Sequence, residues 1–453
     1  MFTMDAQAAE AVSYDTVKRY IMRHERTNGR LTKLLRYYCG EHAILTRQKE
    51  DSTAPNSRLV CNHAKEIADT AAGYFVGNPI TYNAAGANVL QEWFSAADID
   101  SVDMALAKSM GIYGRGYELV CMSDADSPTP KSYSIDPRNA FVVYDDTVEH
   151  RPLFGVYYFP TFDPDGHPKG FKITLYTKTE EVHYETASGL ESAAETRRIP
   201  NRFGLVPLVE YENNEEQQGD FEQVISLIDA YNLLMSDRVN DKEQFVDAIL
   251  LLINSMLGDT DEEITEARER LLRDKMLELP SDSDARYLTR TFDESGVEIL
   301  KKALEQDIHK FANVPCLSDE NFAGNSSGVA MEYKLLGIEM ITKIKERCFK
   351  RGLKKRVELY SAIAGLKGRP ATVEIEPVFT RGLPKNLTEI SAVVSQLQGM
   401  VPDEILLALL PFVKDPKAAL ELLKEEQAEK MRQSLAAFGT QPNSRPEDED
   451  DAE

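Results

Sequence analysis

The sequence predicts an α+β fold whose first half combines helices with a mostly antiparallel sheet and whose second half is largely helical. Between residues 116 and 211, short runs rich in β-branched and aromatic residues are separated by turn residues, which is typical of strands. From Phe221 onward, apolar residues recur at spacings of three, four or seven, which mark one face of an α-helix. A polar, glycine-containing loop at residues 318–328 separates two long helical patterns.

In the first half, helical patterns come before the strands. Periodic apolar residues predict helices over residues 12–38, 62–74 and 89–111, with a short β-like run at 80–82. Asp163-Pro164-Asp165-Gly166 predicts a turn, because glycine adopts positive φ without strain. The strands predicted before and after this turn lie at residues 117–121, 141–144, 155–159 and 171–176.

In the second half, the longest apolar pattern runs from Phe221 to Ile253. If it forms one helix, that helix spans roughly 50 Å at about 1.5 Å per residue. The acidic tail, residues 447–453, cannot bury itself and is expected to be disordered. The elements predicted between them are an acidic helix at 262–274, a β-like interlude at 275–289, helices at 295–312 and 330–363, a strand at 373–379, and three short helices between 387 and 438.

The composition indicates ordinary hydrophobic cores and a large negative charge. The 453 residues are 42% hydrophobic and 28% charged, and the formal net charge is −23. Tight nucleic-acid binding depends on Lys and Arg, so this charge argues against a protein that grips DNA or RNA. The most apolar segment, residues 248–257, is about half as long as a membrane span. The N-terminus has no secretory signal, and five scattered cysteines without CxxC spacing indicate free thiols in a reducing cytoplasm.

The sequence contains no motif for nucleotide or metal chemistry. It has no G-x-x-x-x-G-K-[ST] loop, and Gly111-x-x-Gly114-x-Gly116 leads into a strand, so it predicts a turn and not a dinucleotide site. The seven histidines have no HxH or HExxH spacing, and each is expected to be a surface or strand residue. Adjacent acids such as Asp145-Asp146 are expected to be solvated. We therefore expect no enzyme activity, no metal and no cofactor.

The loop at residues 318–328 combines a free backbone with short polar side chains. Gly324 and Gly328 allow close approach of a polar ligand, and Phe322 is the only bulky apolar residue. The loop lacks the lysine of a nucleotide-binding loop, so its role is something other than cradling phosphate. Its candidate residues are Asp319, Glu320, Asn321, Phe322, Ala323, Gly324, Asn325, Ser326, Ser327 and Gly328.

The helix predicted after this loop carries a local reversal of charge. Residues 343–356 include eight basic side chains and one acidic side chain, Glu346. Such a face is either solvated or paired with neighbouring acids, or it is a surface along which a polyanion slides. The members of the stripe, at i, i+4, i+7 and i+11 of the helix, are Lys343, Arg347, Lys350 and Lys354.

Short motifs spread over roughly residues 35–360 occur in the same order as in one known family. No single motif is decisive, but their collinearity is specific. The motifs are Tyr37-Tyr38-x-Gly40, residues 62–69, 73–80, 113–118, 135–137 and 144–146, and the denser pieces 203–216, 227–232 and 321–330. In this order they resemble the portal proteins of tailed bacteriophages, specifically those of long-tailed phages of Gram-positive bacteria.

The resemblance implies a portal fold and a role in DNA passage. Portal proteins form a ring, twelve-fold in the virion, at one capsid vertex, and double-stranded DNA passes along its axis. The partners implied are further copies of the chain, terminase, head-completion or adaptor proteins, and capsid and scaffolding proteins, with assembly in the host bacterial cytoplasm and no membrane. The implied parts are a wing at 1–215, a stem helix at 216–257, a clip at 258–292, a second stem helix at 293–315, a DNA-facing tunnel loop at 316–329, a tunnel and wing helix with a returning strand at 330–382, a helical crown at 383–438 and a disordered tail at 439–453.

Two alternatives remain open from the sequence. A non-portal capsid or adaptor protein would lack a loop between two long helices. A metal-dependent nuclease or other DNA-processing enzyme would use the clustered acids, such as residues 261–263.

Overall fold

Backbone contacts divide the chain into two compact units, Met1–Gly382 and Leu383–Glu453. The computed structural model describes residues 1–7, 12–50, 54–83, 88–123, 128–245, 249–256, 258–274, 282–288, 294–317, 328–368, 376–381, 387–410, 413 and 416–438.

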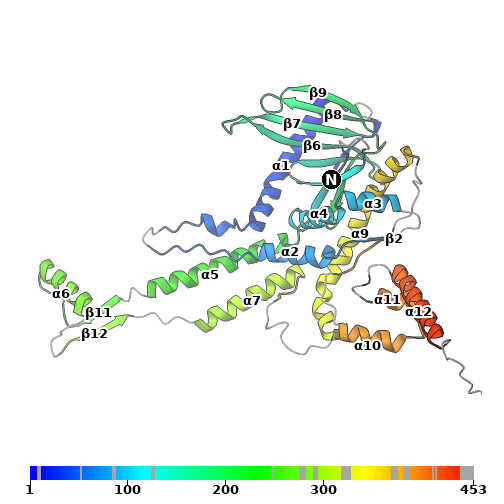
Figure 1. Cartoon of the computed structure of the whole chain (residues 1–453). Helices are drawn as coiled ribbons and strands as arrows, with labels where there is room; N and C mark the ends of the chain where they lie inside the picture. The colour runs from blue at the N-terminus through cyan, green and yellow to red at the C-terminus, as the bar shows by residue number, and fades with distance from the viewer. Residues whose placement is uncertain are drawn as a thin grey trace, which may run out of the picture. The chain divides into compact units, whose positions relative to one another are not determined.

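A six-stranded sheet with the order β1-β5-β6-β7-β8-β9 forms one end of the larger unit (Figure 1). β1 runs parallel to β5, and the other neighbours are antiparallel. The strands predicted at 141–144, 155–159 and 171–176 are confirmed, whereas β1, β8 and β9 were not predicted. The strands are β1 Phe2–Met4, β5 Ala140–Asp145, β6 Pro152–Phe162, β7 Pro168–Thr177, β8 Glu180–Thr186 and β9 Ala193–Pro200.

The predicted turn between β6 and β7 is also confirmed. Gly166 has φ +84°, and its N–H donates to the carbonyl oxygen of Asp163 at 3.0 Å. Only glycine adopts this conformation without strain, so the Asp-Pro-Asp-Gly sequence fixes the register of the hairpin.

Helix α1, Tyr14–Tyr38, covers one face of this sheet, as Figure 1 shows. The Ser13 side chain accepts a hydrogen bond from the Thr16 N–H and caps the helix. Val17 and Ile21 are buried against Phe141 and the other apolar side chains of the sheet. The helix predicted over residues 12–38 is therefore confirmed. Its buried side chains complete the hydrophobic core on this face of the sheet.

A second, three-stranded sheet with the order β10-β3-β4 packs against the other face of the first. Its strands are β3 Arg115–Met122, β4 Pro130–Ile135 and β10 Leu208–Glu212. Side chains such as Tyr117, Val142 and Leu208 fill the space between the two sheets. β3 confirms the strand predicted at 117–121, and the prediction of a mostly antiparallel sheet holds for both sheets.

Three helices and a short strand pair flank the smaller sheet. They are α2 His63–Val76, α3 Asn88–Ala96 and α4 Ile99–Tyr113, with β2 Thr81–Asn83 antiparallel to β13 Glu376–Val378. The prediction of one helix over residues 89–111 is wrong. The chain turns between α3 and α4 at Asp98, whose φ is +49°, so the apolar pattern belongs to two helices.

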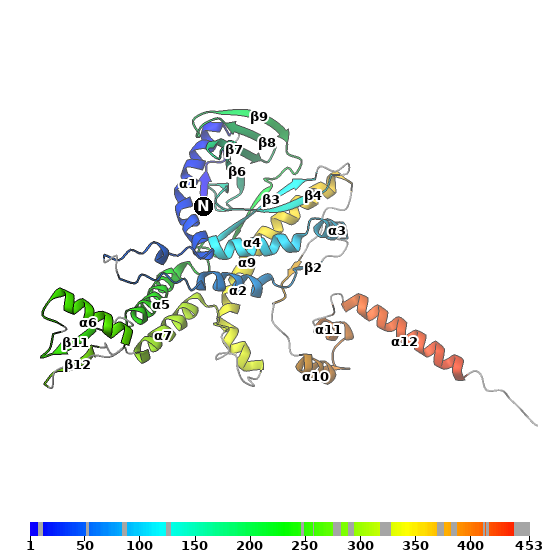
Figure 2. The ribbon, with the colours of Figure 1, turned by 60° about the vertical axis from the view of Figure 1, so that its left-hand side comes forward.

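Two antiparallel helices run away from the sheets, as Figures 1 and 2 show. They are α5, Ile225–Phe245, and α7, Glu294–Ala312, and a short 3-10 turn at Glu222–Val224 leads into the first. Ion pairs join them side by side. Arg238 Nη1 is 3.0 Å from Glu298 Oε2, and Lys242 Nζ is 3.0 Å from Glu294 Oε1.

The prediction of one helix from Phe221 to Ile253 is wrong, because the helix ends at Phe245. The run Ile249–Ile253 forms β11, which pairs antiparallel with β12, Asp284–Leu288, and α6, Asp261–Asp274, lies between them in sequence. A short continuous apolar run fits a strand as well as a helix, and here the pairing with β12 decides. β12 confirms a strand within the interlude predicted at 275–289.

Helix α9, Gly328–Leu366, has 39 residues and extends from α5 and α7 into the core beside the smaller sheet (Figure 2). Its buried residues Phe349, Leu353 and Tyr360 pack with β3, β10, α3 and α4. The helix predicted over residues 330–363 is therefore confirmed. Among the described residues, no helix is long and apolar enough to cross a membrane.

The smaller unit contains α10 Leu387–Leu397, α11 Asp403–Ala408 and α12 Pro416–Phe438. This confirms three helices between residues 387 and 438, although α12 has 23 residues and is not short. The predicted acidic tail lies outside the described residues.

Candidate functional site

The predicted channel loop lies almost wholly outside the described residues. Residues 319–327 fall in the undescribed stretch 318–327, and Gly328 is described as the first residue of α9. The role of this loop therefore stays a prediction. The described part of the candidate site is α9 and the elements that pack on it.

Acidic side chains on α9 pair with half of the predicted basic stripe. Lys343 Nζ is 3.7 Å from Glu339 Oε1, and Lys350 Nζ is 2.9 Å from Glu346 Oε1, so each lysine pairs with an acid one turn earlier. The other two members, Arg347 and Lys354, are exposed and form no ion pair with the described residues. Among the described residues, the stripe is therefore a mixed-charge face in which two of four cations are paired, rather than a continuous basic ridge.

Arg381, which follows β13 in the sequence, binds the same two acids. Its Nε is 2.8 Å from Glu339 Oε2, and its Nη2 is 2.9 Å from Glu346 Oε2. The Tyr74 hydroxyl on α2 donates to Glu339 Oε2 at 2.8 Å. Burial and this contact raise the pKa of Tyr74 to about 12, so Tyr74 stays a donor. The cluster ties the returning strand and α2 to the middle of α9.

The opposite face of α9 carries a basic residue inside the core. Arg356 is fully buried, with Nε 2.7 Å from Glu118 Oε1 on β3 and Nη1 2.7 Å from Asp103 Oδ1 on α4. Tyr211 on β10 donates its hydroxyl to Glu118 Oε2 at 2.5 Å. Two carboxylates thus face one guanidinium, and burial raises the pKa of Asp103 to about 6 despite the opposing effect of Arg356.

A glycine lets α9 approach β10 closely beside this ion pair. A Cβ added to Gly352 would lie 2.3 Å from Cε1 of the Tyr211 ring. Gly352 lies inside α9. In the structure the helix continues through it, and its lack of a side chain makes room for the aromatic ring.

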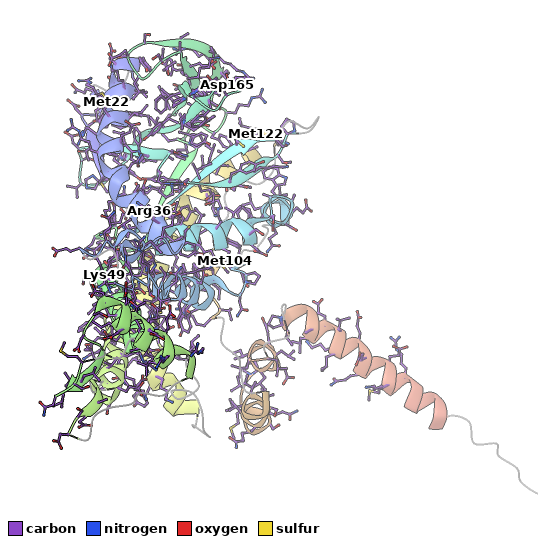
Figure 3. The ribbon with its side chains drawn as sticks, turned by 90° about the vertical axis from the view of Figure 1, so that its left-hand side faces the viewer. Met22, Arg36, Lys49, Met104, Met122 and Asp165 are labelled. Carbon is purple, nitrogen blue, oxygen red and sulfur yellow. The ribbon has the colours of Figure 1, made fainter. Side chains whose placement is uncertain are left out.

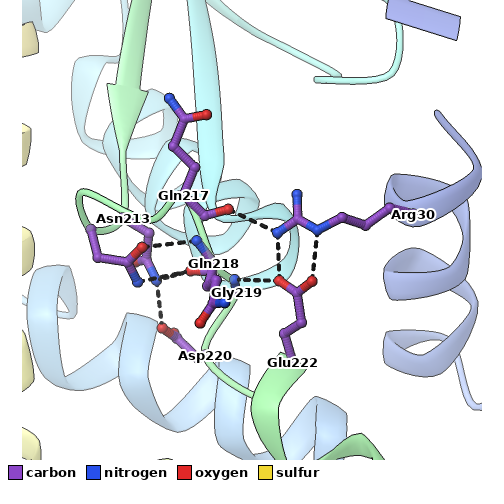
Figure 4. Close-up of polar contacts among 8 residues, drawn as sticks. Arg30, Asn213, Gln217, Gln218, Gly219, Asp220 and Glu222 are labelled. Carbon is purple, nitrogen blue, oxygen red and sulfur yellow. Dashed lines mark hydrogen bonds and ion pairs between the residues drawn. The ribbon is translucent and has the colours of Figure 1, made fainter. Parts of the chain in front are cut away.

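A second buried ion pair joins α9 to the loop that precedes α5. Lys345 Nζ is 2.5 Å from Asp220 Oδ2, and both side chains are almost wholly buried. The other carboxylate oxygen, Asp220 Oδ1, accepts a hydrogen bond from Asn213 Nδ2 at 2.9 Å (Figure 4). The loop formed by residues 213–222, here called the hinge-side loop, is thus fixed to α9.

Arg30 on α1 holds the hinge-side loop from another side. Its guanidinium makes two hydrogen bonds to the Glu222 carboxylate, at 2.6 and 2.5 Å, and a third to the carbonyl oxygen of Gln217 at 2.8 Å (Figure 4). Glu222 Oε2 also accepts from the Gly219 N–H at 3.1 Å. The paired donors of an arginine suit this two-pronged arrangement.

The glycine motif at residues 111–116 receives the hinge-side loop. Gly114 ends α4 with φ +83°, which confirms the predicted turn, and a Cβ there would lie 2.0 Å from the carbonyl oxygen of Gln217. A Cβ on Gly111 would lie 2.8 Å from Asp220 Oδ2. These glycines therefore provide space for the loop.

The first half of α9 exposes an apolar face. Tyr333 is 74% exposed and Met340 is 60% exposed, and Leu336 and Ile344 lie exposed on the same face at helical spacing. On α7, Ile299 and Leu300 are exposed as well. Clustered apolar surface of this kind is typical of protein–protein interfaces.

The expectation that every histidine is a surface or strand residue is wrong for four of them. His24, His42, His63 and His309 are all buried, and none of them lies on a strand. The exposed His167 lies beside Asp163 and Asp165 at the β6–β7 turn, which Figure 3 places at the sheet end of the unit, away from α5 and α7. Their hydrogen bonds stay within the turn.

The comparison with known families identifies the class of protein. The family model for phage portal proteins of the SPP1 Gp6-like type matches residues 17–433. The chain therefore belongs to this portal protein family, which confirms the resemblance seen in the sequence and the α+β portal fold. The family is structural, and its members are virion components at the capsid.

Two individual relatives are also named portal proteins. The portal protein of Bacillus phage SPP1 is 24% identical over 447 residues, which cover 92% of this chain and 88% of the relative. The portal protein of Clostridium phage phiCD119 is 28% identical over 233 residues, which cover 50% of each chain. A chain in the neck of a native GTA particle, solved with C12 symmetry, overlaps 77% of this chain and 88% of its own length at 13% identity and a TM-score of 0.38.

Proposed function

We propose that this portal protein assembles into a closed ring, twelve-fold in the virion, whose central channel carries double-stranded DNA at one capsid vertex. Membership of the portal family supports the proposal most directly. In the virion the ring would dock terminase during packaging and head-completion or adaptor proteins afterwards, beside capsid and scaffolding proteins. Assembly would take place in the host bacterial cytoplasm.

The exposed apolar faces of α9 and α7 support the ring. A ring of identical subunits is held by heterologous contacts, in which each subunit presents two different faces to its two neighbours. One apolar face lies on α9 and consists of Tyr333, Leu336, Met340 and Ile344. The other lies on α7 and consists of Ile299 and Leu300. Their burial between neighbouring copies would remove surface that a single chain leaves in water.

Substitutions on these faces test the ring. Met340→Glu and Tyr333→Glu place a charge in the proposed contact, so we expect loss of rings in negative-stain images and a shift toward monomer in light scattering. Val148→Glu is the matched control, because Val148 is 97% exposed in the loop between β5 and β6 and away from both helices. Rings that persist in both the Met340→Glu and the Tyr333→Glu variant would overturn this choice of interface.

The loop at residues 316–329 and the basic stripe of α9 are proposed to face the channel or a neighbouring subunit. For the stripe, Arg347 and Lys354 are the members to change, because no described acid neutralises them. If Arg347→Gln/Lys354→Gln leaves the ring intact but alters DNA packaging, the stripe faces DNA. If the ring is lost, the stripe contacts the next subunit.

We further propose that the protein does no chemistry and that a separate terminase supplies the energy for packaging. The sequence has no phosphate-binding loop, and the described carboxylate clusters on α9 are bound to arginine and lysine. Incubation with DNA and Mg²⁺ or Mn²⁺ separates this proposal from a nuclease, because a conduit leaves the DNA uncut.

A further inference from the structure

Three metal-ligand side chains meet where α2 begins and α7 ends. His63 and Glu66 stand one turn apart at the start of α2, and His309 lies in the last turn of α7. His63 Nδ1 is 3.2 Å from Glu66 Oε2, and His309 Nε2 is 3.9 Å from the same oxygen. One ligand atom from each residue lies within 4.8 Å of the other two. The three side chains therefore converge on one point.

The hydrogen bond of His309 to the backbone leaves the lone pair of its Nε2 directed toward this point. Its Nδ1 is 3.2 Å from the carbonyl oxygen of Val314, and a carbonyl only accepts, so Nδ1 carries the proton. In this tautomer the other ring nitrogen, Nε2, offers its lone pair to a ligand. A backbone carbonyl that fixes the second ring nitrogen is the usual support of a metal-bound histidine.

The arrangement is incomplete without a cation. The His309 side chain is 5% exposed, and its Nε2 has no hydrogen-bond partner among the described residues. The Glu66 carboxylate, whose Oε2 lies 3.9 Å away, also only accepts. Two acceptors that face each other repel, and a positive ion between them removes this repulsion. A hydrogen-bonded trio without a metal would leave this nitrogen unsatisfied.

The donor set selects the kind of ion. Two imidazole nitrogens and a carboxylate suit Zn²⁺ and similar transition ions, whereas Mg²⁺ and Ca²⁺ prefer oxygen ligands. Ligands of a tetrahedral zinc ion lie about 3.3 Å apart, given metal–ligand distances of about 2.0–2.1 Å. The separations of 3.2 and 3.9 Å from Glu66 Oε2 are close to this value, and the two histidine nitrogens lie within 4.8 Å of each other. The Glu66 side chain is 42% exposed, so water can reach the fourth position.

We propose that His63, Glu66 and His309 bind one Zn²⁺-class ion that links the start of α2 to the end of α7. This site is independent of the ring and goes beyond the proposed DNA conduit. The ion would fix the end of α7, from which the chain continues toward residues 318–327. Binding would displace the proton that His63 Nδ1 shares with Glu66.

Cobalt titration of the full-length protein, first freed of metal with EDTA, tests the site. We expect one Co²⁺ per subunit, with visible d–d absorption that Zn²⁺ abolishes, and a higher unfolding temperature with Zn²⁺ than with EDTA. Glu66→Ala and His309→Gln should each lower the affinity by about tenfold or more. Glu66 is half-exposed, so its variant should keep the fold, which circular dichroism checks.

The exposed trio Asp163, Asp165 and His167 provides the matched control. His167→Gln removes the same type of ligand from a solvated turn and should leave the cobalt signal unchanged. Absence of Co²⁺ binding by the unaltered protein would overturn the proposal. Binding that survives both Glu66→Ala and His309→Gln would overturn it equally, whether or not His167→Gln abolishes that binding.

Discussion

Lys345 of α9 and Asp220 of the hinge-side loop form a buried ion pair, with Nζ 2.5 Å from Oδ2. Both charged groups are shielded from water, so each is stabilised mainly by the other. The pair connects the long helix that reaches the core to the loop from which α5 starts. The position of α5 is therefore set in part by one contact made 125 residues later in the chain.

Lys345→Met should destabilise the protein by about 3–5 kcal/mol, because it leaves the Asp220 carboxylate buried and uncompensated. Urea denaturation measures the loss. Lys343→Met is the control on the same helix. Lys343 is exposed, so its loss should cost no more than about 1 kcal/mol. Equal effects of the two substitutions would show that the Lys345 pair is not buried in solution.

Asp103 should make stability fall as the pH rises from about 4 to about 6. Its pKa is about 6 in the folded protein and lower in the unfolded chain, so over this window the folded state holds the proton more tightly. The advantage of the unaltered protein over Asp103→Asn should therefore shrink across the window, by up to about 3 kcal/mol, and level off above it. Denaturation of both proteins between pH 4 and 7 measures this difference. A gap that widens with pH would show that Arg356 outweighs burial.

Gly114→Ala should destabilise the protein by at least about 2 kcal/mol. Its φ of +83° disfavours any side chain, and the added Cβ would meet the Gln217 carbonyl oxygen at 2.0 Å. Gly29→Ala is the control, because Gly29 lies in the exposed part of α1 with nothing near its Cβ position. Alanine there should be neutral or stabilising by up to about 1 kcal/mol. Thermal unfolding of the two variants distinguishes them.

Replacing Asn325 and Ser326 by tryptophan should leave rings intact but impair DNA packaging, since the loop is proposed to face the channel and bulky groups would obstruct it. Negative-stain images and an in vitro packaging assay give the two readouts. Loss of ring assembly in this variant would mean that the loop holds subunits together instead.

Much of the fold could be predicted because its elements carry strong local patterns. The helix over residues 12–38 and the strand over 171–176 show clear periodicity, and the Asp-Pro-Asp-Gly turn has one favoured geometry. The strand at Ile249–Ile253 could not be recognised, because five apolar residues in a row have no period and only the partner strand β12 decides. The break at Asp98 likewise depends on tertiary packing of α3 and α4.

The candidate site was less predictable because its ion pairs join distant parts of the sequence. Lys345 and Arg356 were counted with the basic run of α9, yet they stand at i and i+11 with Phe349 and Leu353 on the same face. A basic residue on an apolar helix face indicates a buried ion pair. This signal could have distinguished Lys345 and Arg356 from the exposed basic stripe. Their partners, such as Asp220, carry no such mark in the sequence.

The contacts of the hinge-side loop also determine the order in which parts of the fold can form during translation. Arg30 and the turn at residues 111–116 leave the ribosome before the loop does, but Lys345 follows much later. Until it emerges, the carboxylate of Asp220 has no cation and is better left in water than buried. Closure over such long separations is slow. The larger unit therefore completes its fold only once α9 has been translated, and a chain truncated before Lys345 should stay open at this loop.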